Sequence, residues 1–176
     1  VNGVYGMKTG FTNGAGRCLV TACNRNNLDI ITVIIGANTT KQRTSDTIKL
    51  IEYAYKNFEI VNLKGIIENQ FEQWRNLNEG RIIVNKGIQK QVKLQLEELE
   101  YTYIAVQKET NNSIKVEVSC IFYLESPIYR NQLLGNFKIM LGNEVIEVLD
   151  ITSTEEIRKK DIKDYLLEFM QYINKR

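Results

Sequence analysis

Two runs of apolar residues near the start of the chain have the pattern of neighbouring β-strands. The runs are RCLVTAC at 17–23 and LDIITVIIG at 28–36, and both are rich in β-branched residues. The four residues between them, NRNN at 24–27, suit a hairpin because asparagine tolerates the positive φ angles of tight turns. Neither run alternates between polar and apolar positions, so we expect central strands of an antiparallel sheet, covered on both faces by helices.

The pattern then changes to the period of a helix. Ile48, Ile51, Tyr55 and Phe58 recur at spacings of three, four and three and form one apolar stripe. We therefore expect a single amphipathic helix over residues 41–58.

From residue 63 to residue 150 the apolar positions mostly follow a period of two, which is typical of half-buried strands. Glycine, asparagine and the single proline interrupt the pattern at short intervals, as turns require. This density of short strands predicts a β-sandwich or a small barrel, with a boundary near residues 59–63. The alternating stretches include Ile82/Val84, Val92/Leu94/Leu96 and Ile114/Val116/Val118/Cys120/Phe122.

The end of the chain returns to a helical period. Ser153 or Thr154 is the expected N-cap, and Glu155 and Glu156 would fill the first turn. Apolar residues then recur at spacings of three and four and predict an amphipathic helix with a broad apolar face. These residues are Ile162, Tyr165, Leu166, Phe169, Met170 and Ile173. The pattern as a whole predicts an α+β fold with parts at residues 1–60, 61–152 and 153–176.

Composition excludes several kinds of function. The chain has no histidine, which rules out Ser-His-Asp and Cys-His catalysis and removes the commonest zinc ligand. The formal net charge of +2 is too small for a nucleic-acid-binding surface. Three cysteines cannot all pair in disulfides, and no apolar run is long enough to span a membrane. The sequence gives no reason to expect a metal ion or a cofactor.

Lys8-Thr9-Gly10 is the motif that carries candidate chemistry. Serine acyl-enzymes without histidine use a lysine ammonium to hold a proton relay and to attract an anionic substrate. A neighbouring hydroxyl binds the substrate carboxylate, and a glycine lets the substrate backbone lie against the strand. The tripeptide alone is weak evidence, because so short a sequence also arises by chance.

The residues around the tripeptide make it more specific. GMKTGFT at 6–12, AGRCLV at 15–20, IGA at 35–37, RTSD at 43–46 and LIEYAY at 50–55 resemble the low-molecular-mass penicillin-binding proteins, the serine-type D-alanyl-D-alanine carboxypeptidases. The later residues SPI at 126–128 and LG at 134–135 are similar to the β-rich C-terminal domain of that family. The resemblance implies the last part of a penicillin-binding, β-lactamase-like antiparallel sheet with a helix, then a sandwich-like β domain and an amphipathic helix.

The resemblance also implies a role for individual residues. Lys8 would be the active-site ammonium, Thr9 would bind the terminal carboxylate of D-alanine beside Gly10, and the backbone N–H of Phe11 would be an oxyanion donor. Arg43 matches an arginine near the same carboxylate pocket. Lys8 could instead be a solvated lysine at a strand end, and Arg43 could pair with Asp46 on its own helical turn. Phe11 departs from the polar residue that some relatives carry.

Two further motifs of the family, S-x-x-K and S-x-N, do not occur in this sequence. The family carries both on the N-terminal side of Lys-Thr-Gly. We therefore expect the chain to be the C-terminal part of a carboxypeptidase and to be inactive by itself. The resemblance implies that the intact enzyme removes D-alanine from peptidoglycan stem peptides outside the cytoplasmic membrane. It would act through an acyl-serine that β-lactams trap, without a cofactor.

An alternative hypothesis is a non-catalytic module that binds the cell wall or a partner. The carboxypeptidase hypothesis predicts exposed apolar surface on residues 1–58, whereas the module hypothesis predicts that a swapped strand or a partner covers it, as in a homo-oligomer.

The β domain would serve as a spacer. The final helix would either pack on that domain or lie on a membrane surface, because five basic against three acidic residues give residues 159–176 a net charge of +2.

Overall fold

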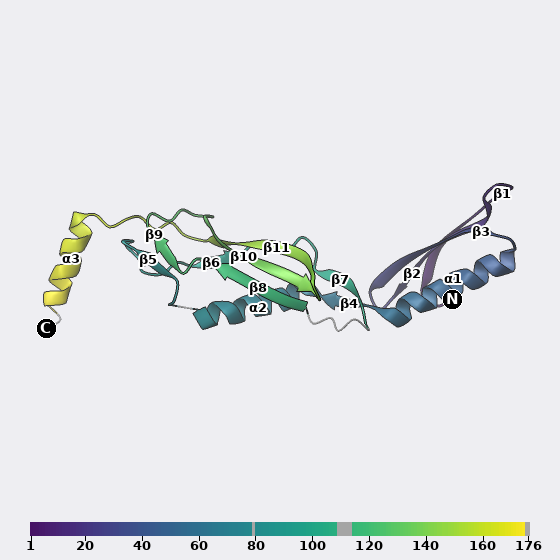
Figure 1. The fold of residues 1–176 in the computed structure, drawn as a ribbon, viewed down its shortest axis with the longest axis horizontal. Helices are drawn as coiled ribbons and strands as arrows, with labels where there is room; N and C mark the ends of the chain where they lie inside the picture. The colour runs from purple at the N-terminus through teal and green to yellow at the C-terminus, as the bar shows by residue number, and fades with distance from the viewer. Residues whose placement is uncertain (79, 109–113, 175–176) are drawn as a thin grey trace. The chain divides into compact units, whose positions relative to one another are not determined.

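The computed structural model describes residues 1–78, 80–108 and 114–174 (Figure 1). Helices and mostly antiparallel sheets give an α+β fold, as the sequence predicts. The chain forms two compact units, one of Val1–Leu63 with Tyr101–Asn112 and the other of Lys64–Glu100 with Ser113–Arg176. The three parts expected at 1–60, 61–152 and 153–176 stay a prediction.

The first unit is built on a three-stranded antiparallel sheet in the order β1 (Val4–Thr12), β2 (Gly16–Arg25) and β3 (Leu28–Ala37). Lys8 pairs with Val20, and Val20 pairs in turn with Val33. The hairpin between β2 and β3 has the predicted chemistry, because Asn26 and Asn27 have φ angles of 52° and 65°. A short antiparallel pair, β4 (Phe58–Asn62) and β7 (Tyr103–Gln107), completes the unit.

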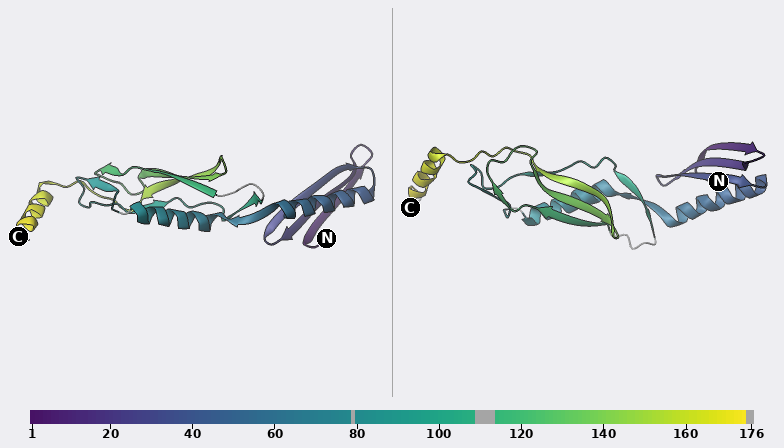
Figure 2. Two further views of the ribbon diagram at one scale, coloured as in Figure 1. Left: turned by 60° about the horizontal axis from the view of Figure 1, so that its bottom comes forward. Right: turned by 45° about the horizontal axis from the view of Figure 1, so that its top comes forward.

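Helix α1 (Thr40–Asn57) packs on one face of this sheet (Figure 2). Its N-cap is Thr39, whose side chain accepts a hydrogen bond from the Gln42 N–H. Leu19, Thr21 and Cys23 of β2 are buried on the covered side.

The opposite face of the sheet is open in the described part of the unit. Val20, Ile31, Val33 and Ile35 are 42%, 73%, 52% and 71% exposed. The expectation that both faces are covered is therefore wrong for these residues, because one helix covers one face only. The apolar surface predicted for residues 1–58 is present, and we call these four residues the open apolar face.

The second unit contains a four-stranded antiparallel sheet. Its strand order is β6 (Leu94–Leu96), β11 (Glu144–Ser153), β10 (Leu133–Leu141) and β8 (Ile114–Cys120). Helix α2 (Leu63–Asn78) lies along one face of this sheet (Figure 2). The Phe71 ring of α2 meets the Phe137 ring of β10 edge-on, with 5.8 Å between centroids.

The helix α2 corrects the expectation of β-structure from residue 63 onward. Leu63, Ile67 and Phe71 lie four residues apart and are all buried, so the helical period was present in the sequence. The alternating residues after position 80 obscured it.

A second correction concerns the start of the last helix. Ser153 and Thr154 do not cap it, because residues 153–159 pair with other segments of the unit. Ile157 exchanges two backbone hydrogen bonds of 2.9 Å with Ile128, and Lys159 bridges to Gly87. Helix α3 begins later, at Ile162–Ile173, with Asp161 as its N-cap. Buried Ile157 holds this segment to the unit, beside the parallel strands β5 (Ile83–Asn85) and β9 (Tyr123–Glu125).

Candidate functional site

Strand β1 carries four of the five residues singled out from the sequence. Lys8 and Gly10 pair with Val20 and Cys18, whereas Thr9 and Phe11 pair with Leu19 and Arg17. Directly paired residues share a face of the sheet, and successive residues alternate between faces. Lys8 and Gly10 therefore lie on the side of the open apolar face, and Thr9 and Phe11 lie on the other side.

In the described part of the sheet, β1 is an edge strand. It pairs with β2 alone, so half of its backbone N–H and C=O groups point away from the sheet. An extended peptide can bind such an edge as an additional strand through main-chain hydrogen bonds. Lys8, Thr9, Gly10 and Phe11 are all exposed along this edge.

The side chains of β1 make few contacts of their own. The Lys8 ammonium donates a 2.8 Å hydrogen bond to the Thr9 carbonyl oxygen. The Arg17 guanidinium lies over the Phe11 ring at 5.1 Å from its centroid. Strand β1 therefore presents an ammonium, a hydroxyl and a glycine, which suit an anionic group on an extended peptide. Arg17 of β2 adds a second cation on the side of Thr9 and Phe11.

Arg43 is the fifth residue, and it lies on the first turns of α1. Its carbonyl oxygen accepts a 2.9 Å hydrogen bond from the Thr47 hydroxyl. The pairing with Asp46 considered from the sequence is not what forms, because Asp46 pairs with Lys49 at 3.5 Å. The Arg43 Nε atom is buried and has no hydrogen-bond partner among the described residues, so its role stays a prediction.

A cluster that sequence reasoning missed holds the sheet to α1. Arg25 binds the Glu52 carboxylate with two hydrogen bonds of 2.8 and 3.2 Å and lies over the Tyr55 ring at 4.7 Å. The Arg25 Nε–H donates to the Asn2 carbonyl oxygen at 3.0 Å, just before β1. The hydrogen bond from Arg25 lowers the pKa of Glu52. This cluster fixes the chain that leads into β1, and only a long-range contact could reveal it.

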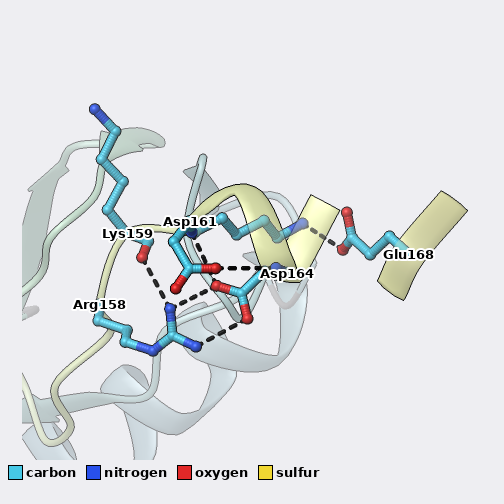
Figure 3. Close-up of polar contacts among 6 residues, drawn as sticks. Arg158, Lys159, Asp161, Asp164 and Glu168 are labelled. Carbon is cyan, nitrogen blue, oxygen red and sulfur yellow. Dashed lines mark hydrogen bonds and ion pairs between the residues drawn. The ribbon is translucent and has the colours of Figure 1, made fainter. Parts of the chain in front are cut away.

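The second unit carries another distinct group, at the start of α3 (Figure 3). Asp161 and Asp164 form a capping box, in which each carboxylate accepts a hydrogen bond from the other residue's N–H, at 3.0 and 2.9 Å. Arg158 holds the Asp164 carboxylate at 2.5 and 2.9 Å, and this lowers the pKa of Asp164 well below its ordinary range. Lys160 pairs with Glu168 on the second turn.

Helix α3 is strongly amphipathic and buries none of its residues. Eight of its apolar side chains are between 47% and 79% exposed. None of the helices that the structure describes is both long and apolar enough to cross a membrane. The exposed side chains are Ile162, Tyr165, Leu166, Leu167, Phe169, Met170, Tyr172 and Ile173.

Two family models match the chain. The D-alanyl-D-alanine carboxypeptidase model matches residues 1–39, which include β1 and its tripeptide. The model of the penicillin-binding protein 5 C-terminal domain matches residues 71–159, half of the chain.

Individual relatives agree with these models. D-alanyl-D-alanine carboxypeptidase DacF of Bacillus subtilis is 27% identical over 96% of this chain and 41% of its own length. DacA of Escherichia coli is 25% identical over 96% of this chain and 39% of its own length. The chain thus spans about two fifths of the length of these curated relatives.

A solved structure supports the same assignment. The D-alanyl-D-alanine carboxypeptidase DacD from Francisella tularensis superposes with a TM-score of 0.57 at 25% identity, over 90% of this chain and 37% of the other. Both the edge-strand motif and the second unit are thus covered by similar proteins. The resemblance drawn from the tripeptide and its surroundings is confirmed: this chain belongs to the penicillin-binding protein 5 family of D-alanyl-D-alanine carboxypeptidases and matches their C-terminal portion.

Proposed function

We propose that this chain supplies the Lys-Thr-Gly strand and the C-terminal domain of a serine-type carboxypeptidase of the bacterial cell envelope. The enzyme removes the terminal D-alanine of peptidoglycan stem peptides through an acyl-serine intermediate, outside the cytoplasmic membrane. β-Lactams acylate the same serine. The observation that carries the proposal is the tripeptide's position on an exposed strand edge, in a chain of this family.

Gly10 supports a functional interpretation of this edge. A Cβ atom at Gly10 would lie 3.6 Å from the Cys18 Cβ, which is an ordinary contact. The fold therefore tolerates a side chain here, so packing within the sheet does not require the glycine. In the proposed enzyme it lets the substrate backbone lie against β1.

The other residues of the site have complementary roles in the proposal. Lys8 holds the proton relay beside the serine, and the Thr9 hydroxyl binds the terminal carboxylate of the substrate. The Phe11 N–H stabilises the oxyanion. The half-buried Arg43 adds positive charge near the carboxylate, which its unpartnered Nε atom supports.

The nucleophile is not part of this sequence, since S-x-x-K is absent. We therefore expect the 176-residue chain alone to take up no fluorescent penicillin. The natural protein that carries this sequence is expected to be labelled. Labelling of the isolated chain would contradict the proposed division of the active site.

The test of Lys8 uses the rate of penicillin acylation in that natural protein. We expect Lys8→Ala to slow acylation by about 10²-fold or more, because the charge acts in the transition state. Lys49→Ala is the matched control, since Lys49 is an exposed lysine of the same unit that pairs with Asp46. Equal rates for the two variants, with equal thermal stability, would overturn the role of Lys8.

We also propose that α3 lies on a membrane surface, which its exposed apolar side chains and flanking basic residues support. Leu166→Asp and Phe169→Asp are expected to abolish co-sedimentation of the chain with anionic vesicles. Gln171→Asp adds the same charge on the polar side and should change binding only slightly. If all three variants sediment equally, α3 packs on protein instead.

The non-catalytic module is the alternative function. It predicts that a partner or a swapped strand covers the open apolar face, which is exposed in this structure. A natural protein that resists penicillin, with that face covered in solution, would favour the module over the enzyme.

A further inference from the structure

A cleft of about 740 Å³ lies in the second unit, at the C-terminal end of α2. Its walls are the last turn of α2, residues 80–82, the segment 89–94 and residues 154–155. None of these residues belongs to the strand edge described above. The volume is within the range of about 300–1,000 Å³ that is usual for small-molecule sites.

Trp74 forms an aromatic wall of the cleft and packs toward the core. Its ring stacks on Phe71 with 6.1 Å between centroids and 20° between planes, and Phe71 packs in turn on Phe137 in the core. The Trp74 carbonyl oxygen accepts a 2.8 Å hydrogen bond from the Asn78 side chain. The indole is only half-buried, so part of it is open to a ligand.

The wall formed by residues 89–94 is anchored by backbone hydrogen bonds at Lys90 and Lys93. The Lys90 carbonyl oxygen accepts a 2.9 Å hydrogen bond from the Val84 N–H of β5. The Lys93 N–H donates to the Glu155 carboxylate at 3.1 Å, and the Lys93 carbonyl oxygen accepts from the Thr154 N–H at 3.1 Å. The segment 89–94 therefore has a defined position beside α2.

Several polar side chains of this cleft are available to a ligand. The side-chain amides of Asn76, Gln89 and Gln91 have no hydrogen-bond partner among the described residues, and Lys90 and Lys93 have no ion-pair partner there. Glu155 is the single carboxylate of the described lining, and it already binds the Lys93 N–H. The free groups thus combine hydrogen-bond donors and acceptors with positive charge.

We propose that this cleft binds a short stretch of glycan made of N-acetylated amino sugars, some of which carry a carboxylate. The apolar face of a sugar ring packs on Trp74. Amide side chains both donate and accept, so they match the hydroxyl and acetamido groups of such sugars. Lys90 and Lys93 face the carboxylates. That the glycan is peptidoglycan rests on the proposed function.

Trp74 makes the test direct, because it is the only tryptophan of the chain and reports from the cleft itself. The full 176-residue chain is titrated with a peptide-free tetrasaccharide of alternating N-acetylglucosamine and N-acetylmuramic acid. We expect a saturable change in Trp74 fluorescence. An acidic peptide, oligoglutamate, is the competing probe and should cause none.

Two double variants and one control separate the contribution of the side-chain amides from that of the lysine charges. Gln89→Ala with Gln91→Ala should weaken binding about tenfold, through the loss of two hydrogen bonds. Lys90→Gln with Lys93→Gln should weaken binding of this tetrasaccharide but not of tetra-N-acetylglucosamine, which has no carboxylate. Lys115→Gln on β8, an exposed lysine outside the cleft, should leave both affinities unchanged.

The proposal is overturned if millimolar tetrasaccharide leaves the fluorescence unchanged, or if the amide variant binds as tightly as the parent chain. Saturable binding of oligoglutamate alone would assign the cleft to an acidic protein partner instead. Penicillin labelling of the natural protein is scored separately. Labelling without glycan binding rejects only the cleft, and glycan binding without labelling rejects only the enzyme.

Discussion

Tyr55 illustrates how one side chain connects local and long-range structure. It lies on the apolar stripe of α1, and its hydroxyl donates to the Cys23 carbonyl oxygen of β2 at 2.7 Å. Burial raises the pKa of Tyr55 far above its ordinary value. The folded chain therefore keeps this hydroxyl neutral at a pH where the unfolded chain ionises it.

This shift predicts a loss of stability in alkali. Because the folded-state pKa is raised, the contribution of Tyr55 is complete below about pH 10 and is lost as the pH rises through the folded-state value. Tyr55→Phe should lower the free energy of unfolding by about 1 kcal/mol at neutral pH. The difference in the free energy of unfolding between the variant and the parent chain should shrink at about pH 11, as measured by urea titrations followed by circular dichroism. A constant difference would contradict the prediction.

Asp164 shows the opposite dependence on pH. The hydrogen bonds from Arg158 lower its pKa, so its contribution to α3 is complete above about pH 4 and is lost as the pH falls toward the depressed folded-state value. In the parent chain, we expect the backbone NMR chemical shifts of residues 162–173 to keep their helical values down to about pH 4. Asp164→Asn should reduce this helicity already at neutral pH. Melting of α3 in the parent chain above pH 4, without an effect of the variant, would exclude this role.

At the scale of elements, the pairing of β10 with β8 depends on a glycine. A Cβ atom at Gly135 would lie 2.3 Å from the Ser119 carbonyl oxygen and 2.8 Å from the Cys120 Cα. Both are backbone atoms of β8, so relief requires the strands to separate. Gly135→Ala should therefore destabilise the second unit by about 2–3 kcal/mol in urea unfolding.

Gly14→Ala is the control for this substitution, because no atom lies within 4 Å of the added Cβ. Gly14→Ala should change the free energy of unfolding by no more than about 0.5 kcal/mol. Equal effects of the two substitutions would show that the close approach of β10 and β8 is not what requires Gly135.

Phe137 tests the packing of α2 on the four-stranded sheet. It is fully buried and meets Phe71 edge-on. Phe137→Ala should lower the free energy of unfolding by about 3–5 kcal/mol, because the substitution leaves a cavity between α2 and the sheet. Leu133→Ala on the same strand, where the side chain is 53% exposed, should cost much less. Trp74 fluorescence follows the transition, since Trp74 stacks on Phe71.

At the scale of the whole molecule, the open apolar face of the first unit should dominate behaviour in solution. We expect the chain to bind a hydrophobic dye and to self-associate, since contiguous exposed apolar surface promotes association. Ile31→Ser with Ile35→Ser should reduce both effects. Leu166→Ser with Phe169→Ser on α3 measures the separate contribution of that helix. A monomer that binds no dye would mean that the face is covered.

Individual residues explain which features the sequence could predict. The turn at Asn26 and Asn27, the helix α1 and the edge-strand tripeptide depend on neighbouring residues, so local patterns were sufficient. The helix α2 was missed although its period was visible, because residues after it alternate. The start of α3 was misplaced because Ser153 and Glu155 resemble a cap, while Ile157 pairs with the distant Ile128.

By itself, the sequence determined the family, the tripeptide and the type of most elements, because these follow from residues close together in the chain. Only the tertiary structure decided which face of the first sheet stays open. It also decided that Trp74 meets Gln89, Gln91 and Lys93 around one cleft. Such arrangements depend on contacts between distant segments, and burial of the apolar faces in the folded chain selects them.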